Sequence, residues 1–358
     1  MALESLTRDD LRASVAAGIL TEAQAASLLA IGEARQGQRA ALSSEDEPFE
    51  LFRGFAEIFV STGLIILMTG ILLLGAAMGG PVLPILTAAM CWLFARYFTL
   101  RRRMALPSIV LVTGFAIGVS GTLALVIDPI FGGGPSDRFP IVVYAGLSLL
   151  ALVAYFWRFR VPFTALLIGL CVAVLVFLAV DWVYPFAPFD WDLDMLFDLA
   201  RGSGLPLATL VFGLIMLAAG LVCDMRDPHR LGRWSATGFW CHILAAPALV
   251  NTIALTAYNS GGTTGNLLLA LALAVIALLA LVIDRRSFLT AGIGYLALLI
   301  GWALEAGNSQ MSLSLLLLIL GAFLTAIGTW WTQIRARLMR LLPNFPGKDR
   351  LPPYAETP

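Results

Sequence analysis

The chain has 358 residues, of which 59% are hydrophobic and 13% are charged, with a net charge of zero and a mean hydropathy of +0.87. This composition excludes a water-soluble globular domain, because only lipid can solvate so large a surface of Leu, Ile, Val and Phe. We therefore expect an all-α, polytopic transmembrane helix bundle.

The N-terminal segment is polar and carries two signals for the start of a helix. Thr7 is followed three residues later by Asp and Thr21 by Gln, the spacing of a capping box, and Gly18 is placed to end the first helix. These signals predict a cytoplasmic helical hairpin over residues 1–36. Two helices this short bury too little surface to be stable alone, so we expect them to dock on the cytoplasmic loops, on a partner or on a second copy.

A polar linker over residues 37–48 leads into a membrane domain over 49–334. The first 57 residues contain no apolar run typical of a signal peptide, so the first hydrophobic helix is expected to act as an uncleaved insertion signal. Ten apolar stretches follow, each long enough to cross a bilayer. They cover approximately residues 58–79, 82–99, 107–127, 140–157, 163–184, 205–223, 235–257, 265–283, 288–305 and 312–331.

The loops between these stretches are alternately arginine-rich and arginine-poor. Sorted by side, 21 of the 23 Lys and Arg residues share a side with both termini, and only Arg138 and Arg201 lie opposite. By the positive-inside rule, both termini are then cytoplasmic, in a bacterial inner membrane. The same sorting gives net charges of +6 inside and −6 outside, which suits contact with anionic phospholipids and needs no nucleic-acid partner.

The longest external loop, residues 185–204, contains an acidic stretch. Asp190, Asp194, Asp198 and Arg201 fall on one stripe at helical spacing, which predicts a helix lying on the outer membrane surface. The stretch lacks the turn Gly and the terminal Glu of a calcium loop, so we interpret it as a solvated face and expect no metal.

The C-terminal segment, residues 335–358, begins as a basic amphipathic stretch that Pro343 interrupts. The Pro-rich tail that follows is expected to be disordered.

Most ionisable residues of the membrane domain lie at or near the ends of the apolar stretches, where interfacial anchoring explains them. These residues are Glu57, Arg96, Asp128, Asp181, Asp224, Asp284 and Glu305.

The seventh stretch, 235–257, is the least lipid-like. It contains Cys241, His242, Pro247 and Asn251, and Pro247 leaves a backbone carbonyl without its helical donor. These residues predict a polar seam inside the bundle. Two interpretations remain: a site for substrate or protons, or polar groups that hold the helices together.

A five-plus-five division of the ten stretches would be compatible with an inverted repeat. Only one pair of segments supports it, GLIILMTG at 63–70 and GLIMLAAG at 213–220. The repeat is retained as a hypothesis.

Catalytic motifs of several enzyme classes are missing from the sequence. It contains no HExxH, Walker A or GxSxG pattern, and the four cysteines form no CxxC pair. A bis-histidine haem would need paired intramembrane histidines, whereas His242 is alone in a span. We therefore expect no catalytic residues, no cofactor and no enzymatic activity.

The layout resembles bacterial multi-pass membrane proteins grouped as family 2157 of the domains of unknown function. The similarity rests on the hairpin with GILTEAQAASLL at 18–29, the hydrophobic helices and the arginine-rich tail at 335–353. It implies an inner-membrane location and supplies no activity.

Ten spans with a broken, polar seventh helix favour a secondary transporter or permease for a small or amphiphilic solute. The alternative is a non-catalytic membrane scaffold or assembly factor, and an enzyme acting on lipids ranks third. The expected partners are the lipid bilayer and another membrane protein or a second copy of the chain.

Overall fold

The computed structural model describes residues 14, 15, 17–21, 24, 54–131, 138–185, 193–227, 230, 233–305 and 311–352. By its internal contacts the chain divides into two units, Met1–Pro48 and Phe49–Pro358. Each unit is described by itself.

In the first unit, the described residues show how one helix ends and the next begins. Gly18 has a φ of 71° and its N–H donates to the Val15 carbonyl at 3.0 Å, the left-handed conformation that favours glycine after a helix. Thr21 N–H donates to Gln24 Oε1 at 2.9 Å and Gln24 N–H to Thr21 Oγ1 at 3.3 Å, the reciprocal pair of a capping box. The capping box predicted at Thr7 lies outside the described residues.

The described residues of the second unit form helices joined by turns, and they contain no strand. Its long helices are α3 (Phe55–Met78), α4 (Val82–Ala95), α5 (Ala105–Phe131), α6 (Arg138–Phe159), α7 (Thr164–Val183), α9 (Gly204–Arg226), α10 (Arg233–Asn259), α11 (Gly262–Ile283), α12 (Ser287–Glu305) and α13 (Met311–Leu341). Its short elements are the π-helical η1 (Arg96–Arg101), α8 (Leu193–Phe197), η2 (Leu199–Arg201) and η3 (Lys348–Arg350).

Nine helices of the described residues are long and apolar enough to cross a membrane. The tenth predicted stretch corresponds to α12, whose apolar part, Ser287–Ile300, is shorter. The prediction of an all-α polytopic bundle is therefore confirmed.

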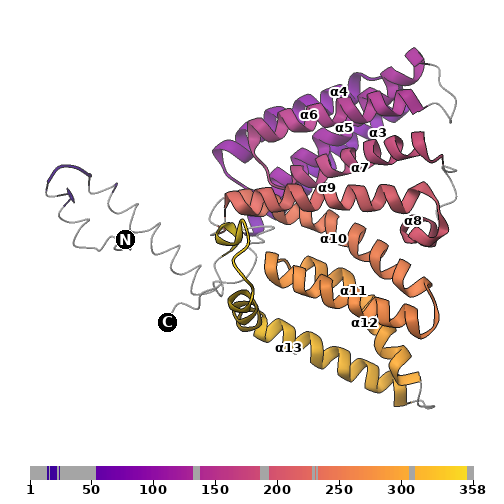
Figure 1. The fold of residues 1–358 in the computed structure, drawn as a ribbon. Helices are drawn as coiled ribbons and strands as arrows, with labels where there is room; N and C mark the ends of the chain where they lie inside the picture. Colours follow the sequence, from indigo (N-terminus) through magenta and orange to yellow (C-terminus); the bar gives the residue numbers. More distant parts are fainter. Residues whose placement is uncertain are drawn as a thin grey trace. The chain divides into compact units, whose positions relative to one another are not determined.

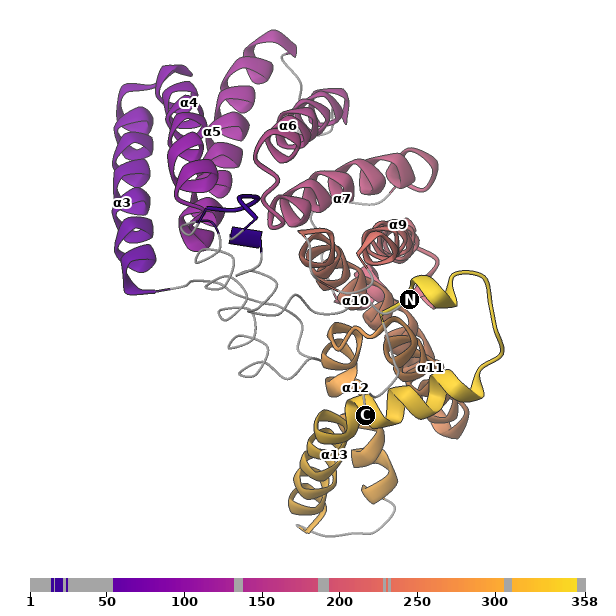
Figure 2. The ribbon, with the colours of Figure 1, turned by 90° about the vertical axis from the view of Figure 1, so that its left-hand side faces the viewer.

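The helices pack on one another largely in chain order (Figures 1 and 2). The most extensive contacts join α9 to α10 and α4 to α5. Two apolar cores result, one built by α3–α6 with the start of α7 and the other by α7 and α9–α13. Many large apolar side chains remain exposed on α3, α4 and α11, as lipid-facing surfaces require.

One end of the helices gathers the arginine-rich connections, including η1, the α9–α10 and α11–α12 turns and η3, and we call it the basic end. The segment with α8 lies at the opposite end (Figure 1).

The two segments that suggested an inverted repeat have unequal environments. A Cβ on Gly63 or Gly70 of α3 would meet nothing within 4 Å, whereas a Cβ on Gly213 or Gly220 of α9 would clash with side chains of α10. The similar letters therefore serve different contacts, and they lend the repeat no support.

The C-terminal segment differs from the predicted disordered tail as far as Pro352. After Leu341 the chain turns back, Lys348 Nζ donates to the Leu342 carbonyl at 2.7 Å, and Leu351 and Pro352 are buried. Apolar burial and this hydrogen bond order the segment despite its prolines. The remaining residues, 353–358, lie outside the described part.

Candidate functional site

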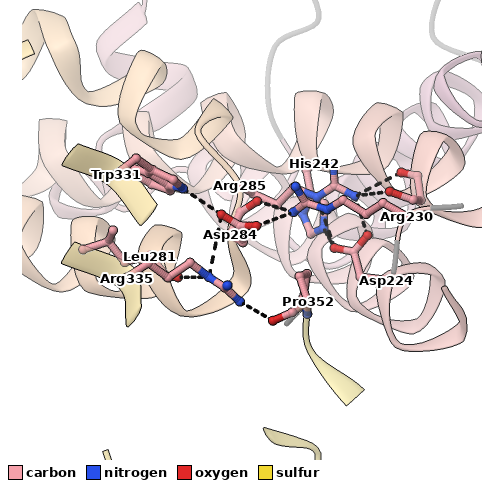
Figure 3. Close-up of polar contacts among 10 residues, drawn as sticks. Asp224, Arg230, His242, Leu281, Asp284, Arg285, Trp331, Arg335 and Pro352 are labelled. Carbon is pink, nitrogen blue, oxygen red and sulfur yellow. Dashed lines mark hydrogen bonds and ion pairs between the residues drawn. The ribbon is translucent and has the colours of Figure 1, made fainter. Parts of the chain in front are cut away.

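A buried group of charged side chains lies at the basic end, where α9, α10 and the α11–α12 turn meet (Figure 3). Asp224 belongs to the last turn of α9, and His242 lies about two turns inside α10. Asp284 ends α11 in the left-handed conformation, with a φ of 58°, and the N–H of Arg285 donates to the Ala280 carbonyl at 3.0 Å. This turn directs Arg285 back toward α9.

Asp224 is the centre of this group. His242 Nε2 lies 2.9 Å from Asp224 Oδ2, Arg285 Nη2 donates to Oδ1 at 2.5 Å, and Arg285 Nε donates to Oδ2 at 3.2 Å. Because a carboxylate only accepts, the Nε2 of His242 carries the proton. The exposed fractions of Asp224, His242 and Arg285 are 2%, 0% and 1%.

Two glycines make room for these side chains between α9 and α10. A Cβ on Gly220 would lie 2.6 Å from His242 Cε1, and a Cβ on Gly238 would lie 2.6 Å from Asp224 Oδ1. The close helix contact and the polar group therefore depend on the same small residues.

A second group surrounds Asp284, next to the first along the chain (Figure 3). Arg230 Nη2 reaches Asp284 Oδ2 at 3.0 Å and its carbonyl at 2.6 Å, and Trp331 Nε1 donates to Oδ1 at 2.7 Å. Arg335 Nε lies 3.7 Å from the same Oδ1. The ion pairs of the combined basic-end network join two aspartates (Asp224, Asp284) and three arginines (Arg230, Arg285, Arg335), so its formal charge is +1 when His242 is neutral.

This arrangement places two groups that can bind a proton, His242 and Asp224, in a buried site. Burying charges is costly unless they are paired and hydrogen-bonded, and the bidentate arginine meets that condition for Asp224. Histidine is the side chain best suited to take up or release a proton near neutral pH. Protonation of His242 would alter the charge shared by Asp224 and Arg285. Among the described residues, no three His, Cys, Asp or Glu side chains are arranged to hold a metal ion.

The residues of the predicted polar seam do not share one environment. Cys241 and His242 are buried, Asn251 is half-buried, and Pro247, within α10, is exposed. Asn251 follows His242 by nine residues, or two and a half helical turns, which places it on the opposite side of the helix. The four residues therefore do not form one polar seam. Instead, His242 belongs to a site with Asp224 of α9 and Arg285 of the α11–α12 turn.

The predicted external acidic helix is also broken. Helix α8 ends at Phe197, and Asp198, 3% exposed, caps η2 by accepting from Ala200 N–H at 2.9 Å. Its other oxygen accepts from Asn259 Nδ2 at the same distance. These bonds withdraw Asp198 from a solvated face. Asp190 lies outside the described residues, and of Asp194 only the backbone is described, within α8.

Several residues interpreted as interfacial anchors are buried and engaged. Asp224 holds the site described above, Glu57 accepts from the N–H groups of Ala105 and Leu106 at the start of α5, and Asp181 forms an ion pair with Arg138. The missed members of the site are Asp224 and Arg285. In the sequence, the one hint of a closely packed face on this helix was Gly220, four residues before Asp224.

A separate apolar hollow of about 560 Å³ lies between α4 and α5. Its lining includes Ala88, Trp92, Phe115 and Val119, and the hydroxyl of its Thr122 donates to the Gly118 carbonyl within α5.

No family model and no solved structure matches the chain. A stretch of 94 residues is 42% identical to the protoheme IX farnesyltransferase of Geobacter sulfurreducens. The match covers 26% of this chain and 32% of that protein. Because this relative is named as a farnesyltransferase, which is an enzyme, the expectation that the chain has no enzymatic activity is contradicted. That expectation rested on missing motifs, which describe other enzyme classes.

Proposed function

We propose that this integral membrane protein is a proton-coupled secondary transporter for a small or amphiphilic solute. The observation that carries the proposal is the buried Asp224–His242–Arg285 group, since ionisable side chains within a membrane bundle mark ion and proton pathways. Asp224 shares hydrogen bonds with an imidazole, which can take up a proton, and with a guanidinium, which stays charged.

The coupling follows from the charge balance of the site. With His242 neutral, Asp224 and Arg285 compensate each other. Protonation adds a positive charge that buried surroundings do not compensate, which favours a conformation in which the site meets water. Full burial of the site then corresponds to the occluded state of an alternating-access cycle.

The charge movement of this cycle gives a test that needs no known solute. We expect proteoliposomes on a solid-supported membrane to show a transient current after a pH step. His242→Gln, which can still donate to Asp224 but does not titrate there, should lose most of this current. Arg226→Gln, an exposed change at the same end, is the matched control. A wild-type current equal to that of empty liposomes would exclude proton coupling.

We propose that the basic end lies on the cytoplasmic side of a bacterial inner membrane, because arginine-rich loops remain on that side. In a variant without the native cysteines, Ser260→Cys, exposed between α10 and α11, should react with an impermeant maleimide in intact spheroplasts. Arg102→Cys, exposed next to η1, should react only after lysis. The opposite pattern would invert the topology.

A second candidate is a membrane-embedded transferase for an isoprenoid or porphyrin substrate. It is favoured by the stretch similar to a protoheme IX farnesyltransferase, and the apolar hollow between α4 and α5 could accommodate an isoprenoid chain. Incubating the purified protein with farnesyl diphosphate and protoheme IX, followed by mass spectrometry, tests this candidate. A farnesylated product would favour the transferase, and its absence together with a pH-evoked current would favour the transporter.

A further inference from the structure

We propose that residues 331–352 form a strap that closes the basic-end side of the Asp224–His242–Arg285 site, and that release of the strap opens the site from this side. The proposal concerns access to the site, so it holds whether the site moves protons or carries out a transfer reaction.

The path of the chain creates the strap. Helix α13 has non-helical dihedral angles at Trp330 (φ −106°, ψ 18°), where its direction changes. Beyond this kink the strap passes α11 and reaches α9 through η3 (Figure 2). At Gly347, a Cβ would lie 3.9 Å from Met225 Sδ, next to Asp224 in sequence. The strap thus spans the helix ends that surround the site.

Arg335 joins the two ends of the strap to the bundle (Figure 3). It is 3% exposed, its Nη2 donates to the Pro352 carbonyl at 2.7 Å, and its Nε donates to the Leu281 carbonyl at 3.0 Å. The same guanidinium lies 3.7 Å from Asp284, the residue that precedes Arg285. One side chain therefore ties the returning tail to the turn that positions Arg285.

The strap is also held at its start by Trp331, whose Nε1 donates to Asp284 Oδ1, and the rest of its buried face is largely apolar. Ala336, Met339 and Leu351 are buried, whereas Arg337 and Arg340 are exposed on the other side of the same helical segment. This amphipathic pattern also suits the membrane interface. Beyond Trp331, the strap combines the buried Arg335 with a narrow apolar face, and this part can exchange its contacts with the bundle for contacts with lipid headgroups.

Native cysteines beside the site report on its accessibility. Cys223 and Cys241 precede Asp224 and His242 in sequence and are buried, while Cys91 is buried in the other core between α4 and its neighbours. Reaction of a buried thiol with N-ethylmaleimide requires local opening, so its rate follows the opening free energy. Cys91 serves as an internal control for general loosening of the fold.

The experiment compares full-length protein in nanodiscs with variants of the strap, using mass spectrometry to locate N-ethylmaleimide. Arg335→Gln and deletion of residues 343–358 should each raise the labelling rate of Cys223 by about tenfold or more, because they remove the tie between tail and bundle. Arg337→Gln, exposed two residues from Arg335, should leave this rate unchanged. Cys91 should remain as slow as in the wild type.

Two results would overturn the proposal. Equal Cys223 labelling in the wild type, Arg335→Gln and the truncated chain would show that the strap does not control access. A parallel rise at Cys91 would show that the segment stabilises the whole bundle, with no local closing role. Neither result depends on a transport or transferase assay, so failure of the strap and failure of the proposed function are distinguishable.

Discussion

Replacing Asp224 by Asn is expected to lower the free energy of unfolding of the membrane domain by about 3–5 kcal/mol, the usual cost of breaking a buried ion pair. Arg285, 1% exposed, would keep its charge but lose the carboxylate that accepts from it at 2.5 and 3.2 Å. The amide of Asn cannot compensate this charge. Thermal or denaturant unfolding in detergent, followed by circular dichroism, measures the effect.

Removing both charges separates the cost of leaving Arg285 unpaired from the net contribution of the ion pair to stability. The double variant Asp224→Leu with Arg285→Met should recover much of the stability, because apolar replacement of a buried ion pair is often neutral. Asp227→Asn changes a half-buried aspartate at the end of the same helix and should cost less than about 1 kcal/mol. Wild-type stability of Asp224→Asn would contradict the assigned burial of Arg285.

Replacing Gly118 by Ala is expected to destabilise the α4–α5 contact by about 1–3 kcal/mol, the range for overpacking. The added Cβ would lie 2.7 Å from the backbone nitrogen of Ala88 and 2.9 Å from the Pro84 carbonyl oxygen. Backbone atoms cannot rotate away as a side chain can, so the two helices must separate. The same unfolding measurement in detergent reports the loss.

Gly121→Ala provides the matched control on the same helix. Its Cβ would lie 3.5 Å from Pro84 Cβ, an ordinary van der Waals distance, and the stability should change by no more than about 0.5 kcal/mol. Equal effects of the two substitutions would refute a specific close approach at Gly118.

The buried site bears on both candidate functions. A transporter would use the titration of His242 to shift the conformation around Asp224, whereas a transferase would use the arginines of the basic-end network to neutralise an anionic leaving group. If the strap controls access as proposed, it would influence either function, because both need access to a site whose central side chains are at most 2% exposed.

Sequence periodicity was sufficient for features that depend on one helix or one turn. The apolar stretches determined the helices, since a membrane span must satisfy its backbone hydrogen bonds internally. Likewise, the capping box of Thr21 with Gln24 and the stop at Gly18 need only residues within a few positions of each other. The arginine-rich loops predicted which helix ends lie together at the basic end.

Only the tertiary structure decided which charged residues became a site. Asp224 meets His242 and Arg285, which are 18 and 61 residues away in the chain, and such pairing depends on which faces of α9, α10 and the α11–α12 turn pack together. Lipid tails are as apolar as a protein core, so an apolar pattern does not distinguish a lipid-facing side of a helix from a buried one. A carboxylate near a span end therefore looks the same in sequence whether it faces headgroups or, as for Asp224, a buried arginine.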